Sequence, residues 1–282
     1  MKIPITNHGR SSGGAFTLVE LLTVIAIGAI LALLATMAAA RTKEKAKSIS
    51  CANNLRNLHG AWLMYATDNG DRLAHNLGGG LSTRSIGPRS DLNWVNNILN
   101  WELDSDNTNL AFAANGPLAP FLNKGSVHRC PSDVALSDTQ RRAGWSNRVR
   151  SYSMNAMVGD AGENSLLGAN IFNPDYRQFI RLADFARPAG IFVFIEEHPD
   201  SINDGYFLNR IEDSQWLDLP ASSHNGGAWL TFADGHVENH HWIEANTRKP
   251  PKPDCALLPL AVPNAQRLDF DWLMERTSDE VP

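Results

Sequence analysis

The stretch "FTLVELLTVIAIGAILALLATMAAA", Phe16 to Ala40, decides how the rest of the chain is organised. Its 25 residues include a single charged side chain, that of Glu20. As a helix the stretch is about 37 Å long, whereas the core of a bilayer is roughly 30 Å thick. A secretory signal peptide has a shorter apolar region, and a helix of a soluble core would show a polar face. The sequence therefore predicts a membrane-spanning helix over residues 16–40, with one carboxylate in its apolar run.

The helix is predicted to continue beyond the membrane over residues 41–70. Apolar residues there recur every three or four positions, which is typical of an amphipathic helix. They are Ala46, Ile49, Ala52, Leu55, Leu58, Trp62 and Tyr65. The segment "DNGD", Asp68 to Asp71, is a stop signal in which Gly70 can adopt the left-handed conformation. We expect the second half of this helix to pack against a globular domain of residues 71–282.

Composition excludes some classes of function. The 282 residues carry a net charge of −5, without the basic footprint that nucleic-acid binding requires, so we expect no nucleic acid as partner. No phosphate-binding loop, GxSxG turn or Cys/His pair in a catalytic context occurs in the sequence. We therefore predict that the protein is not an enzyme.

The segment "GGAFTLVELL", residues 13–22, resembles the N-terminus of type IV prepilins and type II secretion pseudopilins. The resemblance implies a leader of residues 1–15, removed by a prepilin peptidase that also methylates the new amine of Phe16. The residue before the cut is normally Gly in that family, whereas this chain has Ala15 preceded by Gly14. Cleavage after Gly14 stays an alternative. Cleavage after Ala15 is favoured because it places Glu20 at the fifth mature position, where the family has its Glu.

The resemblance also implies a role for Glu20 in assembly. In pilin-like filaments this glutamate neutralises the N-terminal amine of a neighbouring subunit, and a buried carboxylate does need such a partner. The implied partners are the prepilin peptidase, other pilin-like subunits, an inner-membrane assembly platform and the lipid bilayer. The family places the body outside the cytoplasm, on the periplasmic side or the cell surface, with a single pass through the bacterial inner membrane. The basic residues that follow the span, from Arg41 to Lys47, would favour the opposite orientation.

For the body we predict an α+β, pilin-like fold: the long helix packed on a small antiparallel sheet with long loops. Strands are expected within residues 151–159 and 187–197, and a hairpin within 227–242 that turns at Asp234-Gly235. Residues 94–101 suggest a short helix. The Pro-rich tail from Pro250 is expected to be irregular.

A second resemblance concerns the hairpin. Nine residues separate His224 from Asp234-Gly235, a spacing similar to that of the prepilin-type processing-associated H-X9-DG region, here residues 224–242. The segments that begin at Cys51, "CPSD" at Cys130 and "SYSMN" at residue 151 also resemble recurrent parts of that group. We expect His224 and Asp234 to form a polar pair at the base of the hairpin, with Gly235 in the turn.

The three cysteines, Cys51, Cys130 and Cys255, contain no CxxC pair. A disulfide between Cys51 and Cys130 would clamp the helix to the body and stabilise it by roughly 2–4 kcal/mol. Two buried thiols are the alternative, the sequence alone does not choose among the three pairings, and Cys255 is left unassigned.

Two kinds of segment carry side chains that could bind a metal ion. His224, His236, His240 and His241 lie within 18 residues, but strand alternation would send the last two to opposite faces. Residues 104–109 and 68–71 carry oxygen ligands for calcium without the spacing of an EF-hand. We therefore predict no metal site and no cofactor, with calcium as the alternative.

These observations favour a structural subunit of a type II secretion or type IV pilus-like filament, itself the substrate of the peptidase. One alternative is a singly anchored module that binds a carbohydrate or protein through Trp229 and Trp242. The other is a metal-dependent extracytoplasmic hydrolase that uses the histidine cluster.

Overall fold

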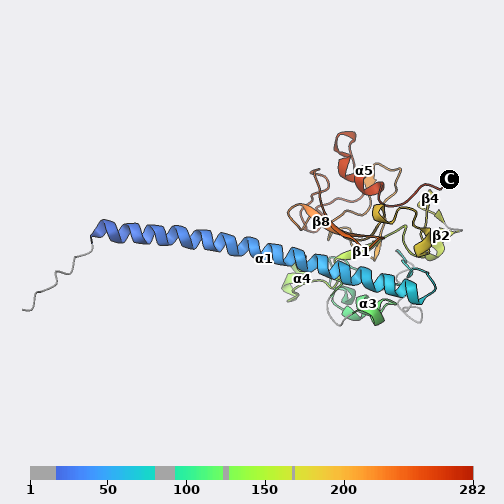
Figure 1. The fold of residues 1–282 in the computed structure, drawn as a ribbon, viewed down its shortest axis with the longest axis horizontal. Helices are drawn as coiled ribbons and strands as arrows, with labels where there is room; N and C mark the ends of the chain where they lie inside the picture. The colour runs from blue at the N-terminus through green and yellow to red at the C-terminus, as the bar shows by residue number, and fades with distance from the viewer. Residues whose placement is uncertain (1–16, 80–92, 123–126, 167–168, 282) are drawn as a thin grey trace, which may run out of the picture. The chain divides into compact units, whose positions relative to one another are not determined.

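The structure is a computed structural model that describes residues 17–79, 93–122, 127–166 and 169–281. The chain forms two units, residues 1–46 and residues 47–282. Helix α1 (Leu18–Asp68) begins in the first unit and ends in the second (Figure 1). The long helix, followed by a small mixed sheet with short strands, gives the α+β, pilin-like layout that the sequence predicts.

In the first unit, α1 exposes apolar side chains all round. Leu18, Leu22, Ile30 and Met37 are each about half exposed or more. Among the described residues, α1 is the one helix long and apolar enough to cross a membrane, and it lies near the N-terminus. These properties fit a single-pass membrane anchor.

In the second unit, one face of α1 is buried. Its buried residues are Cys51, Ala52, Leu55, Leu58, His59, Ala61, Trp62 and Ala66. The predicted stripe is therefore correct in its centre, while Ile49 at its start is half exposed. The helix ends as expected, because Gly70 has a φ of +64° and lets the Asp71 N–H donate to the Ala66 carbonyl at 2.8 Å.

The main sheet has the strand order β6 (Tyr206–Phe207), β1 (Tyr152–Asn155), β5 (Phe192–Glu196), β8 (Gly227–Phe232) and β9 (Val237–His241). Every neighbouring pair is antiparallel except β1 and β6, which are parallel. The prediction of an antiparallel sheet is thus wrong at this edge. The chain leaves β5, passes β1 and returns on its far side, so β6 runs opposite to β5 and along β1.

The described residues of the second unit also form smaller elements. They are the helices α3 (Leu110–Ala114), α4 (Asp138–Arg142) and α5 (Leu268–Met274), the three-stranded sheet of β2 (Ser165–Leu166), β3 (Ala169–Asn170) and β4 (Asn173–Arg177), the pair β7 (Gln215–Trp216) and β10 (Leu260–Ala261), and six short 3-10 turns.

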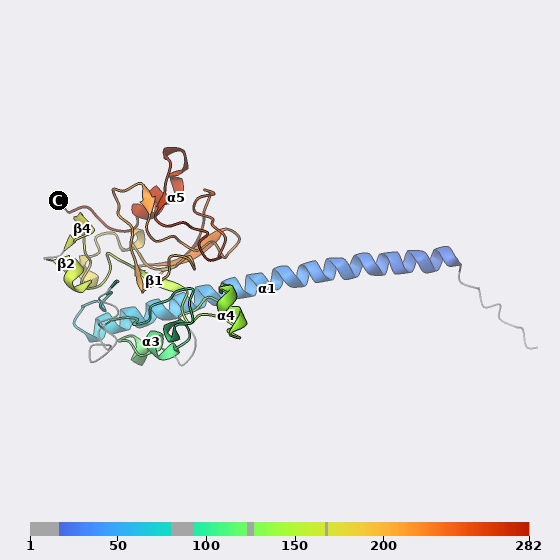
Figure 2. The ribbon, with the colours of Figure 1, turned by 180° about the vertical axis from the view of Figure 1, so that it is seen from behind.

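Both faces of the main sheet are covered. Side chains such as Met154 and Phe194 pack against Leu55 and Trp62 of α1. Others, including Leu230, pack in a second core with α5. In both views α5 and the C-terminal turns of α1 lie on opposite sides of the sheet. Helix α3 lies next to these turns, on the side of α1 that faces away from the sheet (Figures 1 and 2).

Two local predictions are wrong. Residues 94–101 form no helix, because their amides donate to distant carbonyls: Trp94 N to His75 O at 3.0 Å and Asn96 N to Phe112 O at 2.8 Å. The tail after Pro250 is not wholly irregular, since it contributes β10 and α5, which covers one face of the sheet. The predicted hairpin is present as β8 and β9, with five paired positions.

Candidate functional site

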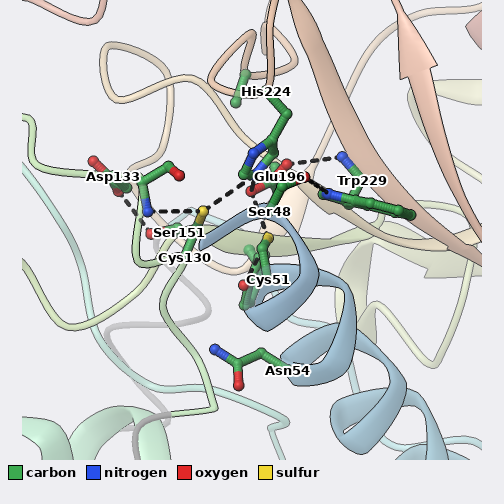
Figure 3. A network of polar contacts seen from close by, with 12 residues as sticks. Ser48, Cys51, Asn54, Cys130, Asp133, Ser151, Glu196, His224 and Trp229 are labelled. Atoms are coloured by element: carbon green, nitrogen blue, oxygen red, sulfur yellow. Dashed lines mark hydrogen bonds and ion pairs between the residues drawn. The ribbon is translucent and has the colours of Figure 1, made fainter. Parts of the chain in front are cut away.

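Four chemically reactive side chains meet where α1 packs on the sheet. Cys51 comes from α1, Cys130 from the loop before α4, Glu196 from the end of β5 and His224 from the turn before β8. One ligand atom of each residue lies within 4.8 Å of those of the other three, and all four residues are buried. Figure 3 shows these side chains converging from separate segments of the chain. We call this group the Cys/Glu/His cluster.

One carboxylate oxygen lies at the centre of the cluster. The Cys51 thiol donates to Glu196 Oε1 at 2.7 Å, and His224 Nε2 lies 2.9 Å from the same oxygen. Cys130 Sγ is 3.4 Å from His224 Nε2. Each of the four atoms thus contacts at least one of the others.

Surrounding groups hold these side chains in place. The backbone N–H of Trp229 donates to Glu196 Oε2 at 2.7 Å, and the N–H of Ser132 donates to Cys130 Sγ at 3.3 Å (Figure 3). The hydroxyl of Tyr152 lies 3.1 Å from Cys51 Sγ. Glu196, Cys130 and Cys51 therefore each have a further contact that fixes the orientation of the side chain.

Local structure explains why these side chains point inwards. Glu196 lies two residues after Phe194 on β5, so alternation places both on the face of the sheet that packs on α1. His224 opens a tight turn in which Asn225 and Gly226 have φ angles of +55° and +84°, the conformation that Asn-Gly favours. The N–H of Gly227 donates back to the His224 carbonyl at 3.1 Å and closes that turn.

The acid–base properties of the cluster are interdependent. Burial, together with hydrogen bonding to Cys130 and the charge of Glu196, raises the pKa of the Cys51 thiol well above its ordinary value. The hydrogen-bonding interaction with Cys51 lowers the pKa of Cys130. Burial opposes a charge on His224, but its contacts with Cys130 and Glu196 outweigh burial and raise its pKa to about 10. The cluster therefore favours a cation at the imidazole of His224 and makes the Cys130 thiol more acidic.

The structure brings together the two cysteines for which a disulfide is predicted. Both are buried thiols here, and Cys255 is a third, half-buried thiol. Cys51 and Cys130 are neighbours within the cluster, so a clamp between α1 and the body is sterically reasonable at this place. The disulfide itself stays a prediction.

The expected pairing of His224 with Asp234 is wrong. His224 contacts Glu196 and Cys130, whereas Asp234 Oδ1 accepts from the N–H and Nδ1 of His236. The two residues lie at opposite ends of β8, because Asp234 is in the turn between β8 and β9 and His224 precedes β8. Gly235 does occupy the turn, with a φ of +94°.

The other three histidines near the hairpin, His236, His240 and His241, do not contact the cluster. His236 contacts Asp234 and stacks on Phe232, and His240 stacks on Trp272 with 3.5 Å between ring centroids. His241 is exposed at the end of β9.

In the two oxygen-rich segments that could bind calcium, residues 104–109 and 68–71, carboxylates accept hydrogen bonds from backbone N–H groups. Asp106 Oδ2 accepts from the N–H of Ile98 at 3.0 Å, and Asp71 Oδ2 accepts from the N–H of Ala183 at 3.2 Å. Their carboxylates satisfy backbone donors of neighbouring loops, which explains why acidic residues are placed there.

The two tryptophans considered as binding contacts belong to the interior. Trp242 is 3% exposed and donates to the Ala221 carbonyl, while Trp229 is partly buried and donates to Ser48 of α1. A pocket of about 430 Å³ lies elsewhere, lined in part by Asp204 and Asp218. These carboxylates accept backbone N–H groups of Gly79, Tyr206 and Leu208, so their primary contacts are structural.

At the other end of the chain, Glu20 helps to start α1. The N–H and the hydroxyl of Thr17 both donate to Glu20 Oε2 at 2.8 Å, and the Glu20 N–H donates to Thr17 Oγ1 at 3.2 Å. This is a capping box, in which an N-terminal Thr and a Glu three residues later satisfy each other's backbone N–H groups. Sequence reasoning missed it, although the pattern "TLVE" is its signature. The predicted processing residues Gly14, Ala15 and Phe16 lie outside the described residues.

Residues 10–36 match the Prokaryotic N-terminal methylation motif. The matched segment contains the predicted cleavage position, Glu20 and most of the predicted span. The match supports a type IV pilin-like protein that a prepilin peptidase processes. It also implies assembly with other pilin subunits. No curated protein and no solved structure matches the chain.

Glu196 is the cluster residue that sequence reasoning did not find. Its signal is weak: an acid that ends the apolar run "FVFIE" and is followed by a second acid, Glu197. The sequence singled out the three other members, Cys51 and Cys130 as a possible disulfide pair and His224 as part of the H-X9-DG region.

Proposed function

We propose that this protein is a pseudopilin-like structural subunit, assembled through α1 into a type II secretion or type IV pilus-like filament. The observation that carries the proposal is the match of residues 10–36 to the N-terminal methylation motif, with Glu20 five positions into the mature chain if the cut follows Ala15. The body of residues 47–282 forms the outer part of the subunit and lies outside the cytoplasm.

The contacts of Glu20 suggest how one carboxylate serves two states. In the single chain, Oε2 accepts two hydrogen bonds from Thr17, which reduces the cost of placing the carboxylate beside hydrocarbon. After cleavage the amine of Phe16 is a cation close to the same depth in the membrane. In the filament, Glu20 of one subunit then pairs with the amine of a neighbour.

Mass spectrometry of the mature N-terminus tests the processing step. In protein isolated from membranes of the source cells, we expect a chain that begins at N-methylated Phe16. A chain that begins at Ala15 would move the cut to the position after Gly14. An intact chain from cells that contain the peptidase would contradict the proposal and leave a simple anchor for a binding module.

The variant Glu20→Gln tests the assembly step. Glutamine can replace glutamate in a capping box, so α1 should still begin at the same place, while the negative charge is lost. We expect the wild-type protein to be cleaved and to form multimers that can be cross-linked in membranes, and Glu20→Gln to be cleaved normally but to form no such multimers. Glu44→Gln, farther along α1, is the matched control and should assemble normally. Equal assembly by Glu20→Gln and the wild-type protein would exclude charge pairing at this position.

A further inference from the structure

The Cys/Glu/His cluster has the composition of a metal centre. Two sulfurs, one imidazole nitrogen and one carboxylate oxygen come from four segments and lie within 4.8 Å of one another. Sulfur, imidazole and carboxylate are the ligands that Zn²⁺ uses in proteins, and four of them complete its usual tetrahedral shell. We propose that Cys51, Cys130, Glu196 and His224 bind one structural zinc ion.

The distances between the ligand atoms are compatible with this ion. With zinc–ligand bonds of about 2.0–2.3 Å, the atoms of a tetrahedral shell are roughly 3.4–3.8 Å apart. The Cys130–His224 separation is 3.4 Å, and the closer contacts of Glu196 Oε1, 2.7 Å to Cys51 and 2.9 Å to His224, need to open by less than about 1 Å. Rotation of the side chains about their terminal bonds supplies a movement of this size.

Charge and hydrogen bonding support the same assignment. Two thiolates, one carboxylate and Zn²⁺ carry the same total charge as a Cys₃His site, a common structural zinc centre. The N–H of Ser132 donates to Cys130 Sγ, and the N–H of Trp229 donates to Glu196 Oε2, the oxygen that does not face His224. Contacts of this kind orient ligands around a bound metal.

The site is closed, which indicates a structural ion. All four ligands are protein side chains and all are buried, so no coordination position is left for a substrate. This distinguishes the centre from that of a hydrolase. By linking α1 to residues near 130, 196 and 224, the ion would hold together a body in which much of the chain is loop.

Metal analysis of the full-length protein tests the proposal. The chain is purified in mild detergent without metal-affinity resin or chelator, and zinc is measured by elemental mass spectrometry. We expect about one zinc per chain. In Cys130→Ser and His224→Gln, zinc affinity should fall at least ~100-fold, since even loss of an outer contact costs 10–100-fold. The matched controls Cys255→Ser and His241→Gln should retain the ion.

A second measurement avoids the variants altogether, in case they fail to fold. Replacement of zinc by Co²⁺ in the wild-type chain should produce a sulfur-to-cobalt charge-transfer band and the intense visible bands of a tetrahedral site. Wild-type protein that neither contains zinc nor binds Co²⁺ in this way would overturn the proposal. So would a Cys51–Cys130 disulfide in the isolated protein, or equal zinc in all variants. The N-terminal processing described above is measured independently and does not depend on this result.

Discussion

Acid should weaken the body because two histidines are buried in their neutral form. His59 of α1 is 2% exposed, its Nδ1 lies 3.2 Å from Thr231 Oγ1, and burial lowers its pKa to about 4. His128 is 2% exposed, and burial together with the charge of Arg150 lowers its pKa to about 4. Protonation would place an imidazolium in each of these interiors.

The sign and size of the effect follow from the difference between the folded and unfolded states. In the unfolded chain a histidine has a pKa of about 6.5, so between pH 6.5 and 4 the unfolded state binds more protons than the folded state. The contribution of the two neutral histidines to the free energy of unfolding is therefore fully present above about pH 6.5. It is lost as the pH falls toward 4. Between pH 7 and pH 5, each histidine should cost about 2 kcal/mol, or about 4 kcal/mol for both.

Urea unfolding of the full chain in mild detergent, followed by tryptophan fluorescence at pH 7 and pH 5, measures this loss. The comparison uses His59→Gln and His128→Gln, which cannot titrate, and His241→Gln, which removes an exposed imidazole. Each buried variant should lose about 2 kcal/mol less than the wild-type protein on acidification. If His59→Gln and His128→Gln show the same difference between pH 7 and pH 5 as the wild-type protein, the reasoning from burial is wrong.

Two further substitutions test the packing of the body by the same urea assay. Gly159 has a φ of +90°, and a Cβ there would lie 2.4 Å from the Ala74 carbonyl oxygen, so Gly159→Ala should destabilise the fold by about 3 kcal/mol. The control is Gly60→Ala, because Gly60 faces open space on α1; this substitution should stabilise the fold by about 0.5–1 kcal/mol. The side chain of Asn155 donates to two buried carbonyls, including that of Thr277, and accepts a third hydrogen bond. Asn155→Ala should therefore lower the free energy of unfolding by about 2–4 kcal/mol. An unchanged urea midpoint would contradict the assumption that these hydrogen bonds stabilise the fold.

Local patterns in the sequence predicted much of the fold. The long helix, its end at Gly70, the buried strand β5 and the hairpin of β8 and β9 all follow from periodicity or turn residues within one segment. The parallel edge strand β6 could not be predicted this way, because its two residues acquire their role only by pairing with β1. The same holds for residues 94–101, whose conformation is set by hydrogen bonds to loops distant in sequence.

The Cys/Glu/His cluster illustrates the same limit in chemical terms. Cys51, Cys130 and His224 each belong to a segment that the sequence distinguished, yet nothing in the order of the chain shows that these segments meet. Their meeting depends on the register of β5, which turns Glu196 toward α1, and on the Asn-Gly turn that presents His224. His236 and His240, which are close to each other in sequence, instead stack on other aromatic rings and are not part of the cluster. Sequence proximity therefore did not indicate which reactive side chains lie together in the fold.

The position of the cluster along α1 connects the proposed zinc site with the proposed assembly through α1. Cys51 is the first buried residue of the helix, so the cluster lies where the body begins to enclose α1. In a subunit held in a filament by its helix, any force on the body reaches α1 first at this end of their interface. Apolar contacts at such an edge open one after another, because each is weak and non-directional. To release α1 at this point the zinc–sulfur bond of Cys51 would have to break, so a zinc centre would strengthen the interface where peeling starts.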